Sequence, residues 1–201
     1  PEEEYVLEPG DMLYLPPMWA HDGIAEGECM TYSVGFRSPK QDELARELFL
    51  RLSDAPDECP KDVVYKDPKQ TAVAHPGEIP AALLDFARQA LEKALAEPLA
   101  LERALGETLS DPKPGVWFEP ADDFGLIENV RLNQRTRMLY DAQHIFINGE
   151  SYLAAGRDAE LMRQLADTRQ LSSAEVQQLS DDALQLLSSW VDAGWAHSTA
   201  G

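Results

Sequence analysis

The sequence has few cysteines, few basic side chains and no long apolar run. Its two cysteines, Cys29 and Cys59, are too few for a disulfide framework and fit no zinc spacing, which indicates a reducing, cytoplasmic environment. No apolar stretch approaches the roughly 18 residues that span a bilayer, so we expect a soluble protein. An initiator methionine and a signal-peptide pattern are also missing, and the first residues have the pattern of a strand already under way. We therefore expect a fragment of a longer chain.

Acidic side chains outnumber basic ones by 36 to 17, which gives a formal net charge of -19. Such a surface repels nucleic-acid phosphates and anionic lipid head groups, so we expect neither direct nucleic-acid binding nor membrane binding. The charge favours a basic partner protein. Solubility alone would also account for it.

The first 37 residues alternate apolar runs with turn residues. Pro-Gly-Asp separates two apolar runs in YVLEPGDMLYLPP, and CMTYSVGF alternates its side chains as a half-buried strand does. We expect three antiparallel strands between Tyr5 and Phe36.

Helical patterns replace the strands at residue 38. Ser38 and Pro39 suit the N-cap and first turn of a helix, and Leu44, Leu48 and Leu52 fall on one apolar stripe. This helix is expected to stop at the next proline, at position 56.

A proline-rich loop then leads to two further helices. One is expected from about Pro80 and a shorter one from Pro98 to about Leu109. The helices carry more apolar surface than they can bury alone. We therefore expect segments 39–54 and 80–109 to form a homodimer interface.

From about Leu126 a small β meander and a group of helices are expected. VRLNQRTRMLYDAQHIFINGESYLAAG has the pattern of three strands, and its Asn148-Gly149 pair is typical of a type I′ hairpin. A short strand is expected to close the chain. Three helices should precede it, at 158–168, 173–179 and 182–191, and Ser172 with Glu175 should open the second of them. This order resembles a winged-helix module.

The charges of this module argue against DNA binding. From Asp158 onward only Arg163 and Arg169 are basic, against seven acidic side chains. A recognition helix of this sign would be repelled from a major groove. We expect the module to bind protein or to serve as a structural appendage.

One histidine, His21, ends the stretch YLPPMWAHDG, where a small β-barrel can present a metal ligand. A non-haem iron oxygenase needs two histidines and one carboxylate on one face of Fe(II). A His-x-Asp or His-x-Glu pair usually supplies two of them, yet none of the four histidines is followed two residues later by an acid. On the residues alone, a surface or turn role for His21 stays open. His144 is expected on the outer face of its strand.

Several stretches, in order, are similar to one family. EPGDMLYLPPMWAHDG, SVGFRSP, the helical region with YKDP and EIP, and IFINGE resemble the bacterial JmjC-type ribosomal oxygenases of the cupin superfamily, arginine hydroxylases of large-subunit ribosomal protein L-sixteen. The resemblance implies an α+β fold in three segments. These would be the C-terminal strands of a double-stranded β-helix (JmjC/cupin) barrel at 1–37, a helical dimerisation region and linker at 38–125, and a winged-helix-like domain at 126–201.

The resemblance also implies cofactors and site residues. His21 matches the downstream histidine ligand of Fe(II), and Thr31 and Ser33 match the region whose polar side chains help to hold 2-oxoglutarate. Outward-facing strand hydroxyls are an equal alternative for these two. The intact protein would be a dioxygenase that hydroxylates an arginine of a basic ribosomal protein. Because the other iron ligands would lie on barrel strands missing from these residues, we expect this chain alone to be inactive.

Two other interpretations remain at this stage. A non-catalytic dimerising scaffold, whose winged helix binds a protein partner, would explain the helices equally well. A sugar-binding or isomerase-like cupin would need further histidines and a glutamate, and the long helical tail argues against it. The coding sequence upstream of Pro1 separates them, since only the oxygenase requires His-x-Asp there.

Overall fold

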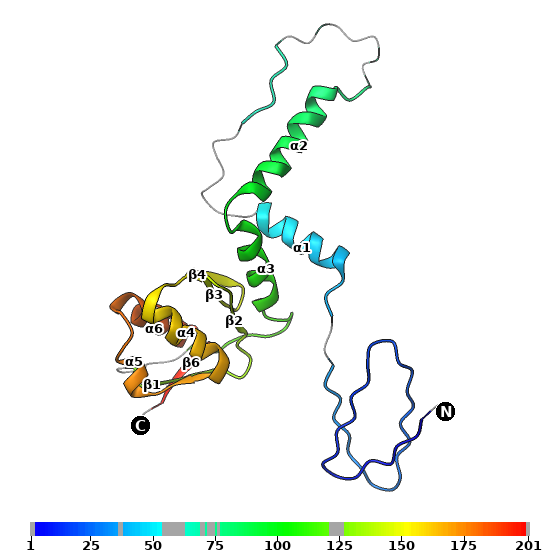
Figure 1. Ribbon diagram of the computed structural model, residues 1–201, viewed down its shortest axis with the longest axis vertical. Helices are drawn as coiled ribbons and strands as arrows, with labels where there is room; N and C mark the ends of the chain where they lie inside the picture. Colours follow the sequence, from blue (N-terminus) through cyan, green and yellow to red (C-terminus); the bar gives the residue numbers. More distant parts are fainter. Residues whose placement is uncertain are drawn as a thin grey trace. The chain divides into compact units, whose positions relative to one another are not determined.

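The chain divides between Ser38 and Pro39 into two units in the computed structural model, and each is described by itself (Figure 1). The structure describes residues 3–35, 38–53, 63–68, 71, 75, 77–120 and 127–199. The predicted helix stop at Pro56, the start of the meander at Leu126 and the thiol of Cys59 lie outside these ranges. Cys29 is exposed.

The first unit contains no strand within residues 3–35. The predicted Pro-Gly-Asp turn is present, since the backbone N–H of Asp11 donates to the carbonyl of Glu8 at 3.0 Å. A second turn joins Trp19 to the carbonyl of Pro16 at 3.3 Å. The three strands expected from the sequence are therefore not formed. A strand needs neighbours for its backbone groups, and a short hairpin with no further strand or helix to pack on is marginal in water.

Three helices open the second unit and confirm the helical patterns of the sequence. They are α1 (Gln41–Ser53), α2 (Ala81–Ala96) and α3 (Ala100–Ser110). Helix α1 packs on α3, whereas α2 extends away from the turn that joins it to α3 (Figure 1). The apolar stripe of α1 is half-buried at Leu44, Leu48 and Leu52, whereas Leu84 and Leu91 of α2 are each 57% exposed.

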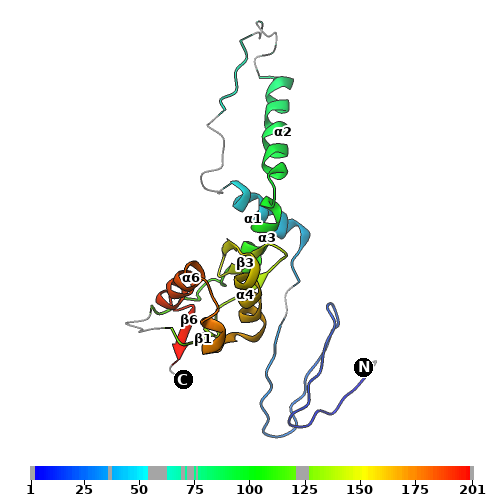
Figure 2. The same cartoon turned by 60° about the vertical axis from the view of Figure 1, so that its left-hand side comes forward.

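Two small antiparallel sheets and three more helices complete the second unit. One sheet has the order β5-β1-β6, formed by Gln170–Leu171, Asn129–Leu132 and Ala196–Thr199. The other has the order β2-β3-β4, formed by Met138–Tyr140, His144–Ile147 and Glu150–Leu153. The helices are α4 (Gly156–Thr168), α5 (Ser173–Val176) and α6 (Asp181–Asp192), and Figure 2 shows α4 and α6 beside β1 and β6. No helix in the described ranges is long and apolar enough to cross a membrane.

Local sequence patterns explain several ends of these elements. Asn148 and Gly149 both have positive φ, at +47° and +90°, as a type I′ hairpin requires. Ser172 and Glu175 form a capping box at the start of α5. The hydroxyl of Ser180 accepts a hydrogen bond from the backbone of Ala183 and so caps α6. The predictions of the Asn148-Gly149 turn and of the opening of α5 by Ser172 and Glu175 are confirmed.

The first strand of the predicted meander is split into β1 and β2, which belong to different sheets. Asn133 causes the break, because its side-chain oxygen accepts from the backbone N–H of Arg135 at 3.0 Å and its carbonyl accepts from Thr136 at 2.9 Å. Such an Asx turn redirects the backbone. Beyond it, β2 pairs with β3, whereas β1 pairs with β5 and β6.

The core of the second unit lies between the two sheets and α4 and α6. Trp190 at 1% exposure is its largest side chain, and Tyr152 packs edge to face on it with ring centroids 5.7 Å apart. The segment before the sheets, residues 111–120, contacts the same unit. The ring of Phe118 packs against Trp195 with ring centroids 6.4 Å apart. Trp117 lies under the guanidinium of Arg135, which is 5.7 Å from the centroid of the indole ring.

The strand β3 is buried on both faces because α3 covers the side of the sheet that lies away from the core. Phe146 on this side is 2% exposed, and its ring lies against Gly106 of α3. His144 stacks on Phe146 at 5.3 Å and is 4% exposed. The prediction of an outward-facing His144 is therefore wrong, since that face is covered by a helix from earlier in the chain.

Replacing Gly106 with alanine is expected to lower the free energy of unfolding by about 1–3 kcal/mol. A Cβ there would lie 2.2 Å from Cζ of Phe146, so the ring must move. At an open helix position the same change would stabilise the protein. Denaturant unfolding of Gly106→Ala, Phe146→Leu and the double variant measures the effect, and the double variant should lose less than the sum of the two. A Gly106→Ala protein as stable as the wild type would contradict this packing.

Candidate functional site

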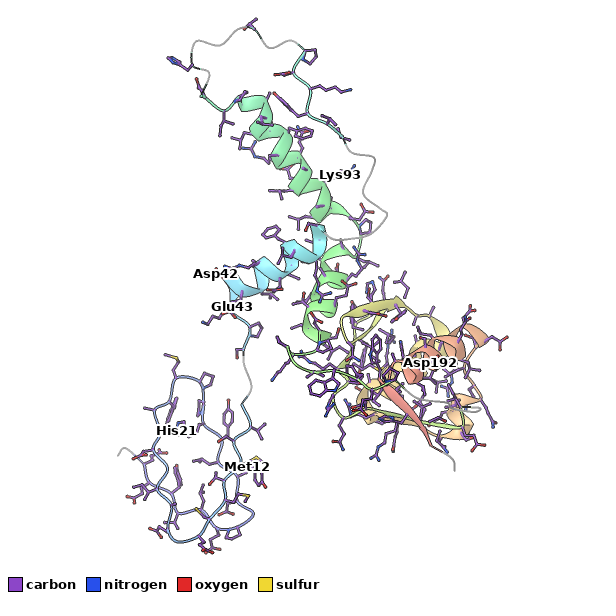
Figure 3. The ribbon with its side chains drawn as sticks, turned by 180° about the vertical axis from the view of Figure 1, so that it is seen from behind. Met12, His21, Asp42, Glu43, Lys93 and Asp192 are labelled. Carbon is purple, nitrogen blue, oxygen red and sulfur yellow. The ribbon has the colours of Figure 1, made fainter. Side chains whose placement is uncertain are left out.

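The three site residues expected from the sequence lie in the first unit. His21, labelled in Figure 3, is exposed, and so are Thr31 and Ser33. In a strand Thr31 and Ser33 would point to the same face. Since no strand forms between residues 3 and 35, that alternation is not imposed and the structure leaves the role of these hydroxyls as a prediction.

The side chains around His21 do not fit a complete iron site. Within the described ranges, no three side chains of His, Cys, Asp or Glu come together as a metal ion would need. A facial triad requires two histidines and a carboxylate. His21 therefore lies in no complete triad among the described residues, and its role as an iron ligand stays a prediction.

A polar pair, half-buried Asp141 and buried His144, closes the turn between β2 and β3. One carboxylate oxygen of Asp141 accepts from the backbone N–H of Gln143 at 2.7 Å and of His144 at 2.6 Å. The other lies 3.1 Å from Nδ1 of His144. Burial raises the pKa of Asp141, but the two backbone N–H groups and the His144 ring outweigh it and hold that pKa below its usual value. No motif in the sequence indicated this pair.

Replacing Asp141 with asparagine is expected to lower the free energy of unfolding by about 1–2 kcal/mol at neutral pH. Because the folded-state pKa of Asp141 is depressed, its stabilisation is present above the unfolded pKa of about 3.9 and is lost as the pH falls through the folded pKa. The gap between wild type and variant should therefore close in acid. Urea unfolding across this pH window measures it, with the exposed Asp192→Asn as the control. A gap that persists unchanged in acid would contradict the account.

The β3–β4 hairpin is held by α1 and α3. Arg51 of α1 forms an ion pair with Asp111 at 2.7 Å and donates to the carbonyl of Gly149 at 3.3 Å. The N–H of Gly149 in turn donates to the hydroxyl of Ser110 at 3.1 Å. The tip of the hairpin is thus engaged by the chain's own helices.

The exposed surface of helix α6 is acidic. Helix α6 contains three aspartates and no lysine or arginine in its 12 residues. Asp181, Asp182 and Asp192 are all exposed. Negative charge of this kind repels a phosphate backbone.

Comparison with known proteins defines the class. Residues 90–197 match the family described as ROXA-like winged helix, which is more than half of the chain, so the chain belongs to this winged-helix family. The matched range includes α3 together with the two sheets. Residues 1–44 match the JmjC domain.

Two curated relatives are similar to this chain over almost its whole length. The chain is 27% identical over 204 residues to the Ribosomal protein uL16 3-hydroxylase of Escherichia coli (strain K12), over 94% of this chain and 52% of that protein. It is 24% identical to the Probable ribosomal oxygenase of Haemophilus influenzae, over 95% of this chain and 54% of that protein. The chain thus spans about half the length of the curated relatives that it matches. The predicted resemblance to bacterial JmjC ribosomal oxygenases is confirmed.

Solved structures share the fold. YcfD, a ribosomal oxygenase from Escherichia coli, superimposes with a TM-score of 0.63 at 19% identity, over 83% of this chain and 48% of that one. The same protein solved with cobalt and succinic acid gives a TM-score of 0.61 at 20% identity, over 81% and 47%. The mixed fold of helices and small antiparallel sheets is therefore confirmed, whereas the barrel end and the dimerisation region stay predictions.

Proposed function

We propose that this chain is the C-terminal part of an Fe(II)- and 2-oxoglutarate-dependent oxygenase that hydroxylates a ribosomal protein. The observation that carries the proposal is similarity over 94% of the chain to a ribosomal protein hydroxylase. The JmjC match at residues 1–44 and the winged-helix match at residues 90–197 support it. The E. coli YcfD structures with cobalt and 2-oxoglutarate or succinic acid support the cofactors, with cobalt as the divalent cation.

In this proposal residues 1–37 form the last strands of a JmjC barrel in the full-length protein. His21 is one ligand of Fe(II), and Thr31 and Ser33 help to hold 2-oxoglutarate. We also propose that residues 1–201 alone are inactive, because none of their four histidines is followed two residues later by an acid. When bound, iron with 2-oxoglutarate would supply the oxidising chemistry, and this chain would contribute one ligand to it.

The proposed substrate is an arginine of a large-subunit ribosomal protein. Ribosomal proteins are basic, and the net charge of -19 attracts a basic protein and repels nucleic acid. We therefore propose a protein substrate, no direct nucleic-acid binding and a cytoplasmic location.

The experiment uses the full reading frame from which the chain comes. We expect a His-x-Asp pair upstream of Pro1. We also expect the purified product to add one oxygen atom to an arginine of a large-subunit ribosomal protein, as seen by mass spectrometry, only when Fe(II) and 2-oxoglutarate are supplied. A frame without that pair, or a product without oxygen transfer, would favour the alternative function, a non-catalytic dimerising scaffold.

The helical segments 39–54 and 80–109 are proposed to mediate a homodimer. Leu84 and Leu91 of α2 are each 57% exposed, and α2 has no buried residue, so an apolar surface is left uncovered. Leu84→Glu with Leu91→Glu should weaken association by about tenfold or more, because charges would be buried in an apolar contact.

Light scattering at micromolar concentration measures this association. Trp117→Glu, which changes a side chain that is 65% exposed outside these helices, should leave the dimer intact. A wild-type chain that is monomeric under these conditions would rule out the dimer.

A further inference from the structure

A cleft of about 690 Å³ lies in the second unit, between the turn that joins α2 to α3, the strands β3 and β4, and the start of α4 and α6. Clefts of roughly 300–1,000 Å³ are typical of ligand sites. The cleft is formed jointly by the helical segment and the winged-helix elements.

The floor of the cleft is apolar and firmly packed. Ile145, Met162 and Trp190 line it and are each at most 3% exposed. Tyr152 adds an aromatic wall that packs on Trp190. Burial and a hydrogen bond to the carboxylate of Glu150 raise the pKa of Tyr152 to about 12, so the phenol is uncharged at neutral pH. An apolar side chain could lie on this floor without displacing a charge.

The rim leaves apolar surface exposed to solvent. Leu153 of β4 is 73% exposed, and Leu99 and Leu186 beside the cleft are half-buried. Leu99 has a φ of +63°, a left-handed conformation that bulky residues rarely adopt. The turn between α2 and α3 thus holds an apolar side chain at the cleft despite an unfavourable backbone.

The charged side chains of the rim are mostly acidic. Glu97, Asp158 and Asp182 line the cleft, and Arg103 is the one arginine or lysine among the described residues that do so. Asp158 accepts a hydrogen bond from the hydroxyl of Ser180 at 2.6 Å and keeps its charge in place. The cleft therefore combines an apolar floor with an excess of negative charge.

We propose that this cleft docks a segment of a basic partner protein, with an apolar side chain on the floor and an arginine or lysine beside Glu97 and Asp182. Charge complementarity selects this occupant. A nucleic-acid strand would meet the acidic rim with its phosphates, and a second copy of the chain would bring another acidic surface to it. This docking site goes beyond the proposed oxygenase function. Its failure can be told apart from failure of that function, because peptide binding at the cleft is measured without turnover of 2-oxoglutarate.

The test uses the full chain and a fluorescein-labelled peptide of alternating arginine and leucine, with fluorescence anisotropy as the readout. Matched peptides carry glutamate for each arginine or serine for each leucine. We expect only the first peptide to bind well. Tighter binding of the glutamate peptide, or no binding of the arginine-leucine peptide, would overturn the proposal.

Two matched pairs of variants locate the charge contribution. Glu97→Lys, just after α2, and Glu92→Lys, within α2, make the same charge change. Only Glu97 lines the cleft. Asp182→Lys and Asp192→Lys make one further matched pair on α6, and of these two residues only Asp182 lines the cleft. Figure 3 labels Asp192. We expect the Glu97 and Asp182 variants to weaken binding by about tenfold, a change of about 1.4 kcal/mol. Equal weakening by both members of each pair would show attraction by net charge alone and overturn the site.

A third pair tests the apolar contact. Leu153→Ser should weaken binding of the peptide, whereas Leu101→Ser, at a position 47% exposed on α3 and outside the cleft, should not. Both leucines are exposed, so both variants should fold. Competition by an oligonucleotide for the peptide site, or loss of a dimer in Leu153→Ser, would assign the cleft to a nucleic acid or to a second copy and overturn the proposal.

Discussion

Replacing His21 with alanine in the product of the full reading frame is expected to lower 2-oxoglutarate turnover by about 100-fold or more. Residues that only orient a metal ligand already cost 10–100-fold when they are changed, so loss of a ligand itself should cost at least as much. Fe(II) affinity should fall in parallel. Succinate formation and a metal titration measure the two effects.

The control for this variant is His75→Ala, which removes an exposed histidine of the second unit. Its turnover and its Fe(II) affinity should equal those of the wild type. If His21→Ala kept wild-type turnover, His21 would be a surface histidine, which is the alternative that the residues alone left open.

Replacing Trp190 with alanine is expected to lower the free energy of unfolding of the second unit by about 3–5 kcal/mol. Trp190 is 1% exposed and contacts Tyr152 at the centre of the core, so its loss leaves a cavity that the sheets and helices cannot readily fill. This loss is a large fraction of the stability of a typical domain, roughly 5–15 kcal/mol.

Trp117→Ala provides the matched comparison, since Trp117 is 65% exposed and rests only under Arg135. Its cost should be no more than about 1 kcal/mol, the value of an exposed cation–π contact. Denaturant unfolding followed by circular dichroism measures both. Equal losses from the two variants would contradict the assignment of Trp190 to the core.

The elements that could be predicted are those specified by nearby residues. The Asn148-Gly149 turn and the capping box of Ser172 and Glu175 form from residues at most three positions apart, and both have the expected geometry. The three helices before the sheets were likewise predicted from local features, namely the spacing of apolar residues and the positions of prolines. Such patterns act within one element and need no distant partner.

The features that could not be predicted depend on contacts between distant segments. β1 pairs with β6 at the other end of the module, so no local pattern separates it from β2. His144 has the alternation of an outward-facing residue, and only α3, from earlier in the chain, covers it. The strands expected before residue 37 show the same limit, since alternation indicates a shared face but cannot supply the neighbouring strand.

The candidate site also has a part that the sequence could predict and a part that it could not. His21 became a candidate ligand through the resemblance of whole stretches to an enzyme family, because one histidine without a nearby acid is chemically ambiguous. The cleft beside Trp190 has no motif at all. Its lining comes from the α2–α3 turn, the hairpin and α6, which are brought together only by the fold.

The most direct test of the central claim is a metal titration of two proteins, residues 1–201 and the product of the full reading frame, under anaerobic conditions. Cobalt can serve as the probe, since it occupies a solved relative together with 2-oxoglutarate. The account predicts that the full product binds the ion in a manner that requires His21, and that residues 1–201 do not bind it. Tight binding of Fe(II) by residues 1–201 through His21, with turnover of 2-oxoglutarate, would contradict it.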